Sequence, residues 1–278
     1  MPPRKSVLPS LLISRQIKEL IDKGKRIDGR GFHSYREITV QPNVIKKANG
    51  SAYVALGNTV VVAGVKFEVG TPFSDTPNEG VLIVEGEVLP IASFEAEPGP
   101  PTEAEVELSR VVDRGIRESG MIDLEKTVIV PGERVLKLFI DFSILNDAGN
   151  LIDVSNLAAV TALLCADYPD PSKLAENPSA PIEEIPKIPL PTRELPISVT
   201  LAYIFGNLVV DPAAEEELSM SSRLTITHTK NDEICSIQKS GSGDLPSEKV
   251  FEAIEIAADK SKELREVVLK AVGERKIA

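Results

Sequence analysis

The chain has 278 residues, and its 42 Asp and Glu outnumber its 31 Lys and Arg to give a net charge of −11. The length predicts two linked domains, and the acidic balance excludes a protein that binds nucleic acid over its whole surface, so any such contact must be local. The two cysteines, Cys165 and Cys235, lack the spacing of a zinc or redox motif, which favours a reducing cytoplasm.

The N-terminal segment predicts a helix rather than a targeting signal. Its longest unbroken apolar run, residues 11–13, is too short for a signal sequence or a membrane span, so we expect a cytoplasmic protein without membrane contact. An amphipathic helix is expected over residues 10–23, with one apolar face made by Ile13, Ile17, Leu20 and Ile21.

The first half of the chain then reads as a sheet covered by helices. Strands are expected at residues 38–40, 51–56, 59–69, 81–89, 128–130 and 135–145. The run 59–65 is apolar enough for a central strand buried on both faces. Thr102 and Glu105 form a capping box that begins a helix over residues 102–119, and the helix over 154–166 is apolar almost all round, so it should be deeply buried.

Eight prolines between residues 168 and 197 predict an extended connector. Beyond it, short strands are expected at residues 197–205, 207–210, 224–229 and 233–239, followed by a long helix over 246–272. The predicted organisation is therefore an N-terminal helical extension (1–24), a first domain (25–168), the proline-rich connector (169–196) and a shorter second domain (197–278) that echoes the first.

The common motifs of nucleotide and metal chemistry are missing. Neither a P-loop nor a dinucleotide-binding glycine pattern occurs, and the glycines at 241 and 243 lack a following lysine. His33 and His228 lie far apart in the sequence, without Cys or Glu at ligand spacing. We therefore expect no metal site and no acid–base role for either histidine.

A basic stripe stands out on this acidic chain. Arg110, Arg114 and Arg117 follow the i, i+4, i+7 spacing, share one helix face and could bind consecutive phosphates. The alternative is an ordinary surface in which Asp113 pairs with Arg117 or Arg110. A second charged segment, residues 25–30, places a carboxylate between guanidiniums and predicts an ion-paired structural turn.

Several segments stand in a recognisable order: R-I-D-G-R at 26–30, S-A-Y-V-A-L-G-N-T-V-V-V-A-G-V at 51–65, an E-L-S-R helix, and N-D-A-G-N before an Ala-rich helix. In this order the chain resembles the RNase PH family of phosphorolytic exoribonucleases. With the proline-rich connector and D-P-A-A-E-E-E at 211–217, it most closely resembles the non-catalytic ring subunits of archaeal exosomes. The resemblance implies an α/β fold of RNase PH type, with two related halves whose mixed sheets are covered by helices.

The resemblance also implies which residues active members need. In those members an arginine after the D-x-G turn holds the attacking phosphate at the N-terminus of the following helix. Leu151 stands there in this chain and cannot neutralise phosphate. Glu95 and Glu97 stand where active relatives carry arginines for the RNA backbone, and the loop 70–80, which would face a ring channel, has no Lys or Arg. We therefore expect no catalytic residues of its own.

Two acids remain at positions that matter in active relatives. Asp211 and Glu217 stand roughly where those relatives place an acidic pair for general-acid or magnesium work. We interpret them as a vestigial pair, either a relic or a solvated acidic turn. The same resemblance places the arginine-bearing helix beside the partner's active cleft, which favours RNA contact by Arg110, Arg114 and Arg117.

The implied function is that of a non-catalytic subunit. The chain would pair with a catalytic sibling, three pairs would form a ring, and subunits with S1 or KH domains would cap it and supply single-stranded RNA. Phosphate and magnesium would act at the sibling's site, with no cofactor of this chain's own. Two alternatives stay open: a self-sufficient homo-oligomeric exoribonuclease that uses Asp211 and Glu217, and a structural spacer without RNA contact.

Overall fold

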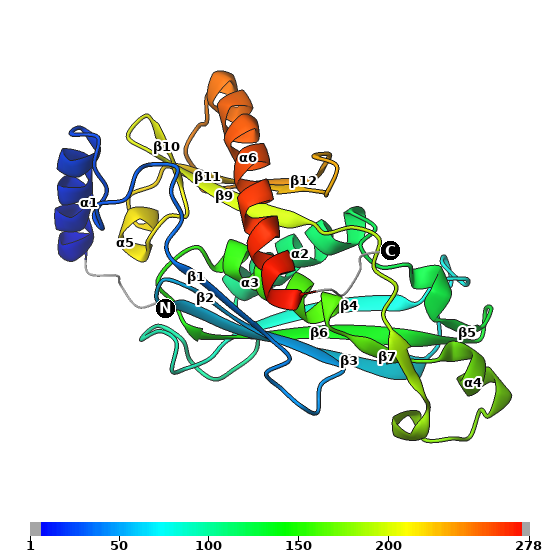
Figure 1. Cartoon of the computed structure of the whole chain (residues 1–278). Helices are drawn as coiled ribbons and strands as arrows, with labels where there is room; N and C mark the ends of the chain where they lie inside the picture. The colour runs from blue at the N-terminus through cyan, green and yellow to red at the C-terminus, as the bar shows by residue number, and fades with distance from the viewer. Residues whose placement is uncertain (1–6, 274–278) are drawn as a thin grey trace.

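Two β-sheets and a buried helix between them frame the molecule (Figure 1). The computed structural model describes residues 7–273; residues 1–6, at the start of the predicted N-terminal extension, and residues 274–278 lie outside this range. A continuous apolar core extends through both sheets and the helices that cover them. The predicted α/β fold with two sheet-and-helix halves is confirmed.

The first sheet has six strands in the order β1-β2-β3-β6-β4, with β5 paired to β6. The strands are β1 (Ile38–Pro42), β2 (Gly50–Leu56), β3 (Thr59–Gly70), β4 (Val81–Val88), β5 (Val128–Val130) and β6 (Arg134–Asn146). Strand β4 runs parallel to β6, whereas the other pairs are antiparallel, so this sheet is mixed as predicted.

Strand β3 is central, but only one of its faces is fully buried. Val61, Ala63 and Val65 are buried, whereas Val60 and Val62 on the other face keep part of their exposure. The prediction of a strand buried on both faces was therefore wrong. Strands β2 and β6 form backbone hydrogen bonds along its two edges. Helix packing covers only one face, so aliphatic residues on the other face are half-buried.

Two helices cover the first sheet. Helix α2 (Glu103–Glu118) begins with the predicted capping box, in which Thr102 Oγ1 accepts a hydrogen bond from the Glu105 N–H and the Thr102 N–H donates to the Glu105 carboxylate. Helix α3 (Leu151–Leu164) lies between the two sheets and is buried from its second residue to its last. It begins earlier than predicted because its polar first turn bonds to the second sheet rather than to solvent.

The proline-rich segment is folded, so the prediction of an extended connector was wrong. It contains β7 (Asp167–Pro169) paired with β8 (Lys187–Pro189), helix α4 (Pro171–Glu176) and a 3-10 turn, η2 (Ile182–Glu184). A further 3-10 turn, η1 (Leu124–Thr127), precedes β5. Prolines begin and end these short elements, and the aliphatic residues between them, Leu174, Ile185 and Leu190, pack into the main core.

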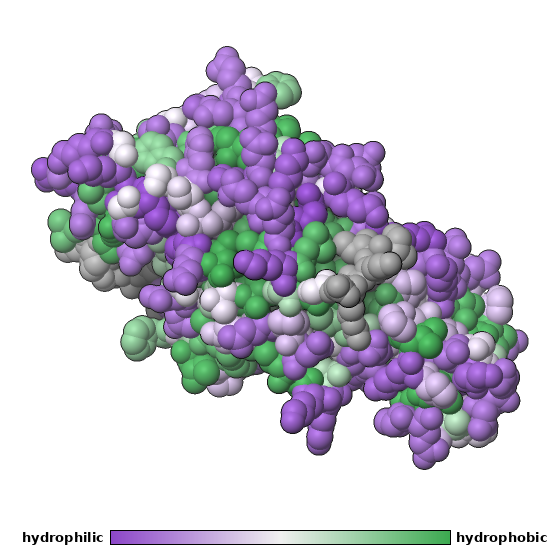
Figure 2. All heavy atoms as spheres, in the orientation of Figure 1, coloured by the Kyte–Doolittle hydropathy of each residue, from purple (hydrophilic) through white to green (hydrophobic). Residues whose placement is uncertain are grey.

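The second sheet has the order β10-β9-β11-β12 and is antiparallel throughout, which corrects the expectation of a mixed sheet in this half. Its strands are β9 (Ile197–Ile204), β10 (Asn207–Val210), β11 (Ser222–His228) and β12 (Ile234–Ser240). Helix α6 (Ser247–Val272) packs on β9 and β11, and its outer side is hydrophilic (Figure 2). Helix α1 (Val7–Ile21) packs through Ile17 and Ile21 on the β9–β10 edge.

A buried ion pair joins the turn after α1 to helix α5 (Ala214–Glu217) in the second half. Arg26 Nε and Nη2 donate to the two carboxylate oxygens of Glu216 at 2.9 and 2.5 Å, and its remaining donors reach the carbonyls of Val210 and Asp211. Both side chains are at most 1% exposed. Because every polar group has a partner, the desolvation cost of burying both charges is offset.

A second buried carboxylate joins α3 to the second sheet. Asp153 accepts hydrogen bonds from Tyr35 Oη at 2.7 Å, from Asn150 Nδ2 at 2.9 Å, and from the N–H and hydroxyl of Thr200 at 3.0 and 2.7 Å. Burial raises the pKa of Asp153 to about 6, against the opposing effect of these donors. Asp153 therefore ties the first turn of α3 to β9 and to the segment before β1.

Removing the guanidinium of Arg26 should destabilise the fold strongly. Arg26→Met leaves Glu216 buried without its counter-charge, so the free energy of unfolding should fall by about 3–5 kcal/mol. Arg15→Met, which breaks the exposed pair with Glu19 on α1, should cost less than about 1 kcal/mol. Urea unfolding measures both, and equal losses in the two variants would contradict the proposed weight of the buried pair.

Asp153 should give the stability a definite pH dependence. Below about pH 4 this carboxyl is protonated in the folded and the unfolded chain; between about pH 4 and 6 only the fold keeps the proton. The free energy of unfolding should therefore fall by about 3 kcal/mol as the pH rises through this range. Asp153→Asn should abolish this fall, measured as the free energy of unfolding from urea curves at several pH values. If that free energy falls equally with pH in the two proteins, Asp153 is not the cause.

Candidate functional site

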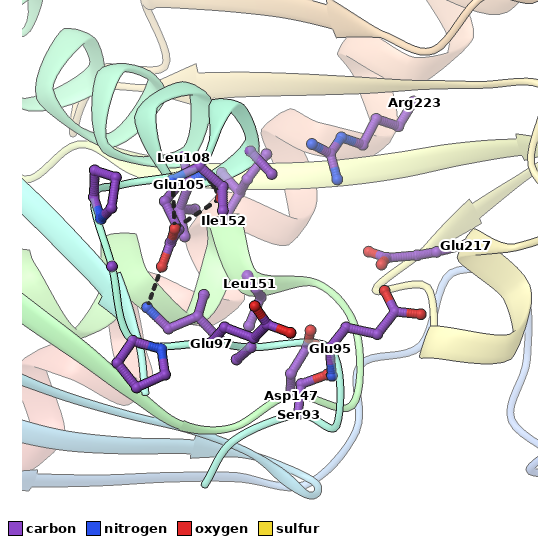
Figure 3. A pocket seen from close by; sticks show the side chains of 17 residues that line it. Ser93, Glu95, Glu97, Glu105, Leu108, Asp147, Leu151, Ile152, Glu217 and Arg223 are labelled. Carbon is purple, nitrogen blue, oxygen red and sulfur yellow. Dashed lines mark hydrogen bonds between the residues drawn. The ribbon is translucent and has the colours of Figure 1, made fainter. Parts of the chain in front are cut away.

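A cavity of about 690 Å³ opens where the loop 89–101, the start of α2 and the start of α3 meet helix α5 and strand β11 (Figure 3). Its apolar lining includes Val88, Leu108, Leu151 and Ile152. Its charged lining consists of Glu95, Glu97, Glu105, Asp147, Glu217 and Arg223. Five carboxylates therefore face one guanidinium, and Figure 3 shows Glu95 and Glu217 directed into the same space.

The N-terminus of α3 meets a carboxylate of the chain itself. The Asn150 N–H donates to Glu217 Oε1 at 2.9 Å, and the Gly149 N–H donates to Asp147 Oδ1 at 3.0 Å. Backbone N–H groups at such a position attract anions, but here internal carboxylates use them. Burial raises the pKa of Glu217, while the hydrogen bond from Asn150 opposes that shift.

The turn before α3 is pressed against the second half. Gly149 has a φ of +90°, and a Cβ there would lie within 2.5–2.7 Å of the backbone of residues 212–214. The Ala214 N–H also donates to the Ala148 carbonyl at 3.1 Å. The cavity is thus built at the contact between the two halves, with its floor from the first and Glu217 from the second.

The predicted acidic pair is divided between two environments. Asp211 is fully buried: Arg36 Nε and Nη2 donate to its two oxygens at 2.9 and 2.6 Å, and Arg30 Nη1 donates at 2.8 Å. Glu217 instead lines the cavity, and Asn150 lies between them, with its N–H on Glu217 and its Nδ2 on Asp211. The interpretation as a solvated acidic turn is wrong for Asp211, because three long-range donors enclose it.

The charged turn at residues 25–30 is ion-paired as predicted, although with different partners. Asp28 pairs with Arg30 Nε at 2.6 Å, whereas Arg26 pairs with Glu216.

Three residues that the sequence analysis singled out separately line one cavity: Leu151, Glu95 and Glu97. The loop 70–80 does not line that cavity.

The arginine stripe is exposed on α2, but its three members differ in their partners. Arg117 forms a two-point pair with Asp113 at 2.7 and 3.1 Å and donates to the Leu82 carbonyl at 3.0 Å. Arg114 Nη1 donates to Gln238 Oε1 on β12 at 3.1 Å. Arg110 has no hydrogen-bond or ion-pair partner within residues 7–273. The predicted alternative, an arginine paired with Asp113 on the helix surface, is therefore found for Arg117.

Arg110 and Arg114 line a groove of about 300 Å³ between α2 and β12, together with Glu103, Val106, Glu107, Val111 and Gln238. The Glu107 carboxylate accepts from the Ser240 hydroxyl and lies 3.8 Å from Arg223. Asp113 is occupied by Arg117. Two of the nearby acids therefore have other partners. Glu103 also lines the groove, but it forms no ion pair with Arg110 or Arg114 among the described residues, so both guanidiniums are available to an outside anion.

Sequence reasoning missed Arg223 and Gln238. Both stand on strands of the second sheet, more than one hundred residues from the helix they face, so no local spacing connects them to it. Strand periodicity could have placed each on a face of the sheet, but not opposite α2.

Within residues 7–273, no three His, Cys, Asp or Glu side chains are grouped to hold a metal ion. Over the same range, no helix is both long and apolar enough to cross a bilayer. His228 is buried at the end of β11, while His33 is exposed in the loop before β1.

Profiles of the 3′ exoribonuclease family match the chain, domain 1 over residues 34–169 and domain 2 over residues 194–260. The chain is 48% identical over 258 residues to the exosome complex component Rrp42 of Thermococcus onnurineus. This match covers 92% of this chain and 94% of that protein. It is 47% identical over 253 residues to the protein of the same name from Methanopyrus kandleri, covering 91% and 94%.

Solved structures agree with these relatives. A chain of the Archaeoglobus fulgidus exosome with RNA bound to the active site matches with a TM-score of 0.86 and 42% identity, over 93% of this chain and 98% of that one. A chain of an archaeal exosome core matches with a TM-score of 0.83 and 39% identity, over 94% and 98%. Because the family models match most of the chain and the relatives share nearly half of its residues, the chain belongs to the RNase PH family of 3′ exoribonucleases.

Proposed function

We propose that the chain is a non-catalytic ring subunit of an archaeal exosome, which shapes a catalytic sibling's site and helps bind single-stranded RNA during 3′-to-5′ phosphorolysis. The observation that carries this proposal is the carboxylate of Glu217 on the N-terminus of α3, where the resemblance would place the attacking phosphate. Relatives that the chain matches over most of their length are exosome components, which supports the assembly.

Electrostatics argue against phosphate in the cavity. Phosphorolysis must bring inorganic phosphate together with an RNA phosphodiester, so cations have to balance two anionic groups. The cavity offers Arg223 against five carboxylates, and Leu151 supplies no charge. A phosphate ion there would be repelled by these carboxylates.

A self-sufficient exoribonuclease is disfavoured by the same geometry. Its acid pair would have to include Asp211, but that side chain is fully buried and its oxygens are held by Arg30, Arg36 and Asn150. A general acid must reach the reacting group, directly or through one water. Asp211 is therefore a structural counter-ion rather than a catalytic group, and the phosphate and magnesium act at the sibling's site.

The RNA contact falls to Arg110 and Arg114. Both guanidiniums border the same groove, and neither forms an ion pair among the described residues, so their charge is available for backbone phosphates. Arg117 is excluded, because it is committed to Asp113 and to the Leu82 carbonyl. In this proposal the ring has three pairs of subunits, with S1- or KH-domain caps that deliver the RNA.

Charge removal tests the assignment. In the ring reconstituted with its catalytic partner, Arg110→Gln with Arg114→Gln should weaken binding of poly(A). The slope of log K against log salt should fall by about 0.7 for each lost contact with single-stranded RNA. Fluorescence anisotropy over a salt series measures both quantities.

The matched control is Asp113→Asn with Arg117→Gln, which removes an ion pair from the same helix and leaves its net charge unchanged. It should leave the affinity and the salt slope unchanged, because neither side chain is assigned to RNA. If the Arg110 and Arg114 variant binds RNA like the unaltered ring, the chain is a structural spacer. If the control weakens binding as much as that variant does, the assignment to Arg110 and Arg114 is wrong.

A further inference from the structure

We propose that Gln238 is a positioning residue for RNA binding, which holds the Arg114 guanidinium at the groove without cancelling its charge. This role rests on the proposed function and deepens it, because it assigns part of the RNA contact to a residue of the second half that acts through α2. Gln238 is half-buried on β12, an edge strand of the second sheet, and lines the groove together with Arg114.

Strand β12 is held against α2 on both sides of Gln238. Gln238 and Ser240 stand two residues apart on the strand, so their side chains share one face of the sheet. The Ser240 hydroxyl donates to the Glu107 carboxylate on α2, and Cys235 Sγ donates to the Gly115 carbonyl of the same helix at 3.7 Å. The strand therefore presents the amide of Gln238 at a fixed place beside the helix.

The chemistry of arginine fixes which end of the amide faces the helix. A guanidinium has five N–H donors and no acceptor, so the carbonyl oxygen of Gln238 takes the hydrogen bond from Arg114 Nη1, at 3.1 Å. This bond uses one of the five donors. The other donors of Arg114, which lines the groove, remain for phosphate oxygens.

The three arginines of the stripe are held in three different ways. Arg117 is held by the carboxylate of Asp113, which neutralises its charge. Arg110 keeps its charge but has no partner in the described part of the chain, so its long side chain must be ordered when it binds an anion. Arg114 is restrained by a partner that carries no charge, so it keeps its full charge in a restricted position.

Such a restraint should strengthen RNA binding without adding a contact to RNA. Immobilising a long, flexible side chain opposes association, and restricting that side chain beforehand removes part of the cost. The salt dependence of binding reports a different quantity, the number of phosphate charges that the protein neutralises. Affinity and salt slope together therefore separate the positioning of Arg114 from its charge.

The test measures poly(A) binding by the ring reconstituted with its catalytic partner, using fluorescence anisotropy over a salt series. Gln238→Met replaces the amide by an apolar group of similar length, so the affinity should fall about threefold to tenfold while the salt slope stays unchanged. Gln238→Glu should keep the hydrogen bond but neutralise Arg114, so the slope should fall by about 0.7. A slope that Gln238→Glu leaves unchanged would overturn the proposal.

Gln41→Met is the matched control. It makes the same chemical change at an exposed position of β1, an edge strand of the first sheet, and should leave the affinity and the slope unchanged. An equal loss of affinity in Gln41→Met and Gln238→Met would show that the effect is not specific to the groove, and would overturn the proposal.

A double-mutant cycle with Arg114→Gln decides whether Gln238 acts through Arg114. Once the guanidinium is gone, Gln238→Met should weaken poly(A) binding no further. If Gln238→Met weakens binding equally with and without Arg114, then Gln238 contacts RNA itself or supports the ring in another way, and it is not a positioning residue.

A failure of this role and a failure of the proposed function give different results. If Arg114→Gln weakens RNA binding but Gln238→Met does not, the groove binds RNA and only the role of Gln238 is wrong. If Arg110→Gln with Arg114→Gln has no effect, RNA contact through the groove is wrong, and the role of Gln238 falls with it.

Discussion

The buried arginine–carboxylate pairs between the segment before β1 and residues 210–217 are the contacts on which the rest of the structure depends. Arg26 binds Glu216 and Arg36 binds Asp211, each through two oxygens and without solvent access for the carboxylate. These pairs fix helix α5 against the turn that begins α3. Glu217 is thereby placed on the helix N-terminus. In our account, Asp211 and Glu216 therefore have a structural role, whereas Glu217 keeps anions from the helix N-terminus.

This arrangement separates charge on either side of α2. The cavity at the N-terminal end of α2 gathers five carboxylates, whereas the groove against β12 holds two arginines that form no ion pair among the described residues. In the function that we propose, this acidic chain contacts RNA through the groove, while the carboxylates of the cavity repel phosphate. The chain has the fold of its family, and we propose that it lacks the family's chemistry because a fold alone does not supply the reacting side chains.

The sequence predicted features that depend on neighbouring residues. The strands, the Thr102 capping box and the deep burial of α3 follow from local sequence patterns, and Leu151 alone suggested, through the family resemblance, that a phosphate-binding cation is missing. It could not predict the folded connector, because its prolines suggest extension while the aliphatic residues between them find a core only in three dimensions. Nor could it show that Asp211 is enclosed by arginines or that Gln238 faces Arg114, since these contacts join residues more than one hundred positions apart.

The most direct test of the central claim is the activity of the purified chain without its partner. With poly(A), inorganic phosphate and magnesium present, release of nucleoside diphosphates should not exceed the background of a sample without protein. Release that Glu217→Gln abolishes, while Arg117→Gln leaves it unchanged, would contradict the account, because it would place a working phosphorolytic site within this chain.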